Sequence, residues 1–77
     1  MTAVLSALQA GRVWFATRPQ FYVTQATDSW RCGGFFCHWD QTRWSWCAYT
    51  RSGPHRWAQT PAAALAAVGY VDPEATP

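Results

Sequence analysis

The first residues of the chain place apolar side chains at helical spacing. Val4, Leu5 and Leu8 follow the i, i+3, i+4 pattern of one helix face. Thr2 is a typical N-cap, and Gly11 stands where a glycine commonly ends a helix. The pattern therefore predicts a short N-terminal helix that ends at residue 11.

The next residues form two runs rich in β-branched and aromatic side chains, at 12–17 and 21–25, on either side of a turn that contains Pro19. This arrangement predicts a β-hairpin. With a three-residue loop, alternation puts four apolar residues on one face: Val13, Phe15, Phe21 and Val23. The other face carries Arg12, Trp14, Tyr22 and Thr24.

Residues 26–34 have the composition of a connection, and a second hairpin follows with strands at 35–40 and 43–49. A two-residue turn at Gln41-Thr42 sets Trp39 opposite Trp44. The face predicted to meet the core holds Phe35, Cys37, Trp39, Trp44, Trp46 and Ala48. The other face holds Phe36, His38, Asp40, Arg43, Ser45, Cys47 and Tyr49.

Residues 51–55 read as a loop, and Thr60-Pro61 supplies an N-cap and a first-turn proline for a final helix that ends at Gly69. This helix is mostly alanine, which leaves room for the rings of the six tryptophans. The predicted fold class is α+β, an antiparallel sheet of four strands with an N-terminal and a C-terminal helix. The helices either cover one face together and leave the other open, or sandwich the sheet between them.

A chain of 77 residues makes one small domain, predicted at 1–71 with a flexible tail at 72–77. No apolar run is long enough to span a bilayer, and the first residues lack the basic region of a signal peptide. We therefore expect a cytoplasmic protein that has no membrane contact.

All six basic residues are arginine, and the acidic residues are few, so residues 1–71 are moderately basic. A GC-rich genome explains the missing lysines equally well.

Cys32, Cys37 and Cys47 are an odd set of cysteines, which favours reduced thiols. Their spacing, together with His38 or His55, does not follow the paired CxxC of zinc sites, so no metal and no cofactor is predicted. Cys37 and His38 are strand neighbours that diverge, and Cys47 and His38 are diagonal neighbours too far apart for direct proton transfer. We expect no enzyme activity.

If one sheet face is open, it presents rings beside arginines, which is typical of protein interfaces. The predicted partner-binding residues are Arg12, Trp14, Tyr22, Phe36, His38, Arg43 and Tyr49. The same composition suits a single-stranded nucleic acid, whose bases stack on rings and whose phosphates meet arginines, and this is the alternative. An unpaired edge strand at 12–17 also allows a homodimer.

The C-terminal third, from Trp44 to Val71, combines a Trp-rich strand, a Gly-Pro loop and the run Thr60-Pro61-Ala62-Ala63-Ala64-Leu65. This stretch resembles the ending of small phage and prophage accessory proteins, in which a TPxxAL helix closes an αβ sandwich. The resemblance implies a mobile-element protein, and such proteins often bind and block a host protein, as anti-CRISPR inhibitors do. The predicted function is therefore a non-enzymatic inhibitor that occupies a host protein.

Overall fold

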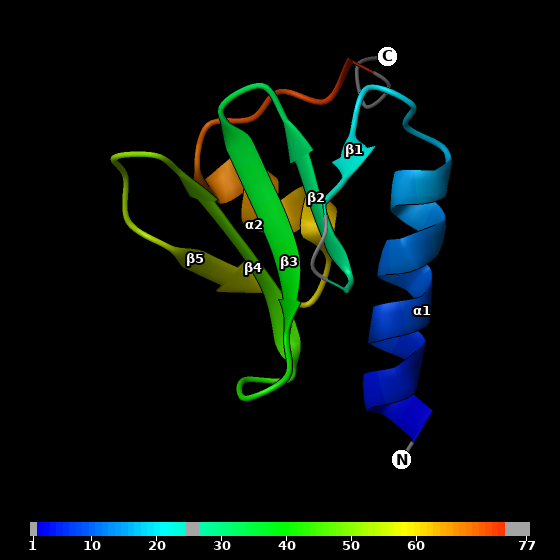
Figure 1. The fold of residues 1–77 in the computed structure, drawn as a ribbon. Coiled ribbons are helices and arrows are strands. Elements are labelled where there is room, and N and C mark those ends of the chain that lie inside the picture. Colours follow the sequence, from blue (N-terminus) through cyan, green and yellow to red (C-terminus); the bar gives the residue numbers. More distant parts are fainter. Residues whose placement is uncertain (1, 25–26, 74–77) are drawn as a thin grey trace.

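The computed structural model describes residues 2–24 and 27–73 as one sheet with a helix at each end of the chain (Figure 1). The elements are α1 (Thr2–Ala16), β1 (Tyr22–Val23), β2 (Ser29–Cys32), β3 (Phe35–Asp40), β4 (Ser45–Thr50), β5 (Arg56–Ala58) and α2 (Pro61–Ala67). Within these residues the sheet has five antiparallel strands in the order β1-β2-β3-β4-β5, which is the chain order. The predicted α+β class is confirmed, with five strands in place of four. No helix in this described part is long and apolar enough to cross a membrane.

The first predicted hairpin is wrong, because residues 12–16 continue α1 and do not form a strand. Gly11 does not end the helix. It lies against the ring of Trp46, where a β-carbon at position 11 would overlap the indole. The glycine is thus a contact residue in the middle of a helix, and helix propensity alone could not distinguish this role from a C-terminal stop.

Two strands of the sheet lie in segments for which the sequence pattern predicts no strand. Residues 29–32, expected in a connection, form β2, which turns at Gly33-Gly34 to pair with β3. Residues 56–58, after the correctly predicted loop, form β5. Gln25 and Ala26, at the end of the first predicted hairpin and the start of that connection, lie outside the described residues. The edge strands are therefore β1 and β5, and the edge predicted at 12–17 does not exist.

The second hairpin is present with its pairing shifted by two residues. Trp39 lies opposite Trp46, and Cys37 lies opposite Ala48, so the loop holds four residues, 41–44. A shift of two keeps each side chain on its predicted face, because alternation has a period of two. The exception is Trp44, which leaves the strand and lies in the loop with a positive φ of 52°.

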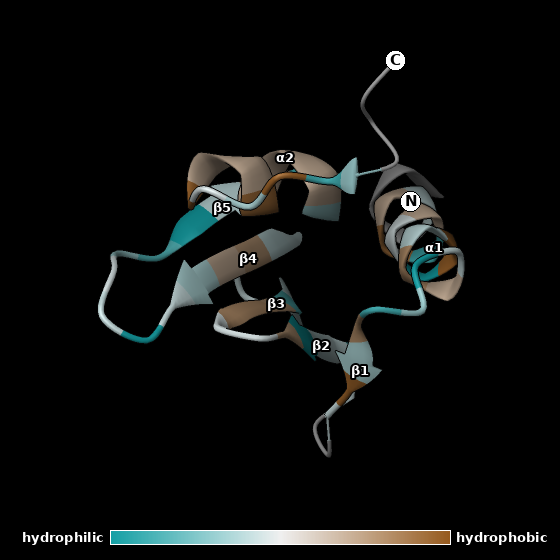
Figure 2. Ribbon diagram, turned by 90° about the horizontal axis from the view of Figure 1, so that it is seen from above, coloured by the Kyte–Doolittle hydropathy of each residue, from teal (hydrophilic) through white to brown (hydrophobic). Residues whose placement is uncertain are grey.

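The core forms between one face of the sheet and the two helices. Trp46 and Leu65 are its largest fully buried side chains, and Ala48 and Ala64 lie beside them. The indole N–H of Trp46 donates to the carbonyl oxygen of Ala7 at 3.2 Å, which ties α1 to β4. In the view from above, α1 and α2 lie on the same side of the sheet (Figure 2). The match between large rings and methyl-sized residues is therefore the basis of the packing.

Helix α2 begins and ends as predicted. The hydroxyl oxygen of Thr60 accepts the N–H of Ala63 at 3.1 Å, Pro61 opens the first turn, and Gly69 follows the helix with a φ of 98°. Asp72, in the segment predicted as a flexible tail, accepts two hydrogen bonds from Arg18, at 3.0 Å from Nε and 2.6 Å from Nη2. The last four residues of that segment, 74–77, lie outside the described residues.

Candidate functional site

The sheet face opposite the helices, here called the open face, carries most of the exposed rings. Because paired residues in antiparallel strands point to the same side, the register fixes its membership. One row across the sheet runs from Tyr22 through Arg31 and Phe36 to Tyr49. The next row runs through Ser29, His38, Cys47 and Trp57. Rings and cations therefore share one side of the sheet.

Three rings of the open face stack on one another and form what we call the aromatic row: Phe36, Tyr49 and His55. The rings of Phe36 and Tyr49 are parallel within 11° with centroids 5.1 Å apart, and those of Tyr49 and His55 are parallel within 9° at 4.4 Å. The guanidinium of Arg31 lies 5.8 Å from the ring centre of Phe36. Both flat faces of Tyr49 are thus covered by neighbours, and the row offers mainly ring edges to a partner.

A second cluster lies where the loop between β3 and β4 meets β5. The guanidinium of Arg43 sits 3.8 Å from the ring centre of Trp57, and the indole N–H of Trp57 donates to Asp40 Oδ2 at 2.9 Å. Asp40 Oδ1 also accepts the backbone N–H groups of Thr42 and Arg43. The hydrogen bond from Trp57 and these two backbone bonds lower the pKa of the Asp40 carboxyl. The carboxylate therefore holds the loop and the ring together.

Cys47 and His55 form the one close thiol–imidazole contact among the described residues, with 3.6 Å between Sγ and Nδ1. Cys47 is 1% exposed, and burial together with the charge of Asp40 raises the pKa of its thiol. A nucleophilic cysteine needs the opposite shift, because the thiolate is the reactive form. The contact has the geometry of a hydrogen bond, and it lies beneath the aromatic row.

Metal ligands do not gather in the described part of the chain. Among residues 2–24 and 27–73, no group of three or more His, Cys, Asp or Glu side chains could hold a metal ion. Cys37 points into the core and Cys47 to the open face, as their alternation in the two paired strands predicts. Burial and the neighbouring Cys47 raise the pKa of the Cys37 thiol.

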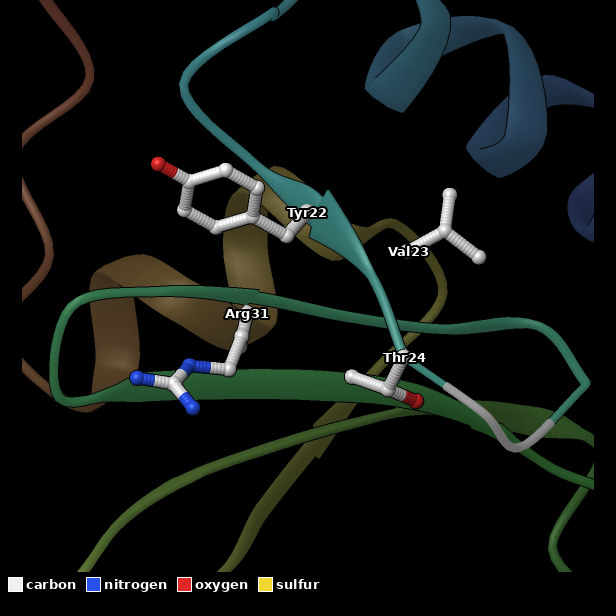
Figure 3. Close-up of a pocket in the computed structure, with 4 residues that line it drawn as sticks. All are labelled: Tyr22, Val23, Thr24 and Arg31. Atoms are coloured by element: carbon white, nitrogen blue, oxygen red, sulfur yellow. The ribbon is translucent and has the colours of Figure 1, made fainter.

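A shallow hollow lies at the β1 edge of the sheet, with a volume of about 500 Å³. It is lined by Tyr22, Val23, Thr24 and Arg31 (Figure 3). Tyr22 and Val23 are among the most exposed apolar side chains of the described chain, at 68% and 71%. The hollow extends the open face to its β1 edge, with a cation and a phenol on its rim.

The structure brings together five of the seven predicted binding residues. Tyr22, Phe36, His38 and Tyr49 lie on the open face, and Arg43 reaches it from the loop by stacking on Trp57. The placement of the other two residues on that face is wrong, because both belong to α1. Arg12 pairs with Asp28, and Trp14 packs half-buried against Phe15.

Sequence reasoning missed three residues at this surface, Arg31, His55 and Trp57, and the exposure of Trp44 in the loop between β3 and β4. Arg31 lies in β2, where the pattern predicts a connection, and Trp57 lies in β5, where it predicts no element. Alternation around Trp30 and Trp57 was the available signal, but runs of three or four residues are too short to show it clearly. His55 precedes β5 and joins the row only through its stacking on Tyr49.

Comparisons of the chain with protein-family models, with curated proteins and with solved structures find no match. The open face is therefore the feature from which a function can be inferred.

Proposed function

We propose that the protein is a non-enzymatic binding module that docks a partner protein on its open face. The supporting observation is the aromatic row of Phe36, Tyr49 and His55, which lies on the face that neither helix covers and is extended by Trp57 and Arg43. Rings and arginines in such a patch provide the strongest contacts of protein interfaces. A stacked row is also rigid, which lowers the entropy lost on binding.

The stacking favours a protein over a single-stranded nucleic acid. A base stacks on the flat face of an exposed ring, whereas in the aromatic row both faces of Tyr49 are covered, and one face of Trp57 is occupied by Arg43. The exposed rings without such a neighbour are Tyr22 on β1 and Trp44 in the loop 41–44, apart from the row. Ring edges suit the side chains and carbonyl groups of a protein surface. The resemblance of the C-terminal third adds a more specific proposal. It is that the protein comes from a phage or another mobile element and inhibits a host protein.

The test is a capture experiment followed by titration. The immobilised chain is exposed to bacterial extract, and any retained protein is purified and titrated against the wild type, Tyr22→Ala and Tyr49→Leu. We expect the affinity to fall about tenfold or more for both variants, while thermal unfolding shows that each is folded. Val13→Ala is the matched control, because Val13 is 62% exposed but lies on α1.

A second experiment tests the alternative function, binding of a single-stranded nucleic acid. Fluorescein-labelled single-stranded DNA and RNA are titrated at low and at high salt and followed by anisotropy. Tight binding that weakens steeply with salt, combined with no retained protein, would identify the alternative as the correct function.

A further inference from the structure

Trp44 stands apart from the other tryptophans of the chain. Its side chain is 53% exposed, and within the described residues it has no hydrogen bond, ring contact or cation contact. Its backbone has a φ of 52°, a left-handed conformation that is costly for a bulky residue. A left-handed backbone at a bulky residue is an outlier, and such outliers concentrate at functional sites.

The loop that carries Trp44, residues 41–44 and here called the Trp44 loop, is held in one shape. Asp40 accepts the N–H groups of Thr42 at 2.9 Å and Arg43 at 3.1 Å, and Arg43 is in turn stacked on Trp57. The indole is therefore presented from a pre-organised turn and not from a free loop. Pre-organisation of this kind reduces the ordering cost of docking.

The charges of the open face and of the Trp44 loop indicate the chemistry of the partner. Arg12 and Arg18 pair with Asp28 and Asp72, and the third described acid, Asp40, is bound within the loop. The other four arginines are exposed, and all four lie on the sheet or its loops: Arg31, Arg43, Arg51 and Arg56. Arg31 lies on the open face and Arg43 in the Trp44 loop, whereas Arg56 pairs with Ala48 and so lies on the side of α2. Against Arg31 and Arg43 the open face carries one described acid, Asp40, so a complementary surface is acidic.

We propose that Trp44 is the anchor of the interface, and that it inserts into an apolar pocket of an acidic partner protein while Arg43 meets carboxylates at the pocket rim. This proposal rests on the proposed function. It adds which residue is buried most deeply in the partner and what charge the partner surface carries. Tryptophan and arginine are the residues most enriched among the strongest contacts of interfaces, and here they are neighbours in one rigid turn.

The test separates binding from folding. The probe is the protein that the immobilised wild-type chain retains from bacterial extract, purified and titrated by calorimetry. Trp44→Asn keeps a residue that tolerates a left-handed backbone but removes the indole. We expect it to unfold at or above the wild-type temperature and to raise Kd at least about 30-fold. Arg43→Gln should raise Kd about 3-fold to 10-fold and flatten its salt dependence.

Thr42→Ala is the matched loop control, because Asp40 is bound by the backbone of residue 42 and not by its side chain. Its Kd should stay within about twofold of the wild type. If Trp44→Asn binds as the wild type does while Tyr49→Leu loses binding, the proposal that Trp44 is the anchor is wrong. The proposal that the open face binds a protein would then still hold. If the wild type retains no protein, or binds only single-stranded nucleic acid, both proposals are overturned.

Discussion

Gly11 lies against the indole of Trp46, with no room for a side chain between the helix and the ring. The contact is reinforced by the hydrogen bond from the Trp46 indole to the carbonyl oxygen of Ala7, one turn earlier in α1. A glycine in a helix interior costs up to about 1 kcal/mol in propensity, so its presence here reflects packing. This contact holds α1 on the face of the sheet that α2 also covers, and the other face is left open.

Gly11→Ala should therefore destabilise the protein although alanine is the better helix former. The new methyl group would overlap the buried indole, and overpacking of this kind costs about 1–3 kcal/mol. Thermal and urea unfolding measure the change. Gly34→Ala is the control, since no atom lies within 4 Å of a β-carbon there. Equal stability of Gly11→Ala and wild type would contradict the packing.

The sequence predicted which residues share a face of the sheet better than it predicted the number and position of the strands. Alternation placed Cys37 in the core and Phe36, His38 and Tyr49 on the open face, and a register shift of two left that unchanged. It could not reveal that Gly11 lies inside a helix, because the reason is a ring 35 positions later in the chain. A local pattern carries no information about such a contact.

The candidate site was predictable to the extent that it lies on long strands. Phe36 and Tyr49 belong to six-residue strands with clear alternation, whereas Trp57 belongs to a three-residue strand. The pattern predicts Trp44 in the core because a two-residue turn is the simplest hairpin. The longer loop follows from Asp40, whose side chain binds two backbone N–H groups and so sets the turn.

Arg18→Ala should destabilise the protein by about 2–3 kcal/mol, which corresponds to a fall of roughly 10 °C or more in melting temperature. The ion pair of Arg18 and Asp72 is mostly buried, with side-chain exposures of 13% and 11%, and the guanidinium also lies 4.1 Å from the ring centre of Trp14. Removing the guanidinium takes away two charge-assisted hydrogen bonds to the mostly buried Asp72 carboxylate. Thermal unfolding checks the effect.

The control for Arg18 is Arg12→Ala. Arg12 pairs with Asp28 in a similar geometry, but its side chain is 44% exposed, so solvent screens the pair. We expect a clearly smaller loss of stability for Arg12→Ala than for Arg18→Ala. The reverse order would mean that the contact between residue 18 and the C-terminal segment does not hold the fold together.

Acid should loosen the Trp44 loop. The pKa of Asp40 is lowered in the folded state by its hydrogen bonds with Trp57 and the loop, so this contribution to stability is complete above the unfolded value of about 4. It is lost as the pH falls through the lower, folded value. The Trp57 indole proton resonance should shift over the same range, and Asp40→Asn should abolish that shift.

Asp28 provides a comparison for the pH dependence of Asp40. The pKa of Asp28 is also lowered, through its hydrogen bond with Arg12, so Asp40→Asn should remove only part of the acid dependence of unfolding. Asp28→Asn should reduce that dependence too, yet leave the Trp57 resonance titrating as in the wild type. A Trp57 resonance that shifts normally in Asp40→Asn would contradict the assigned contact.

The three thiols should differ sharply in reactivity. Cys32 is half-buried, whereas Cys37 and Cys47 are 0% and 1% exposed, and burial raises the pKa of both buried thiols. With Ellman's reagent at pH 8, Cys32 should react at least about 100-fold faster than the other two, which react only when the fold opens. Cys32→Ser should remove the fast phase. Persistence of a fast phase in that variant would mean that Cys47 is reachable and activated by His55, and the open face would then have to be reconsidered as a site of thiol chemistry.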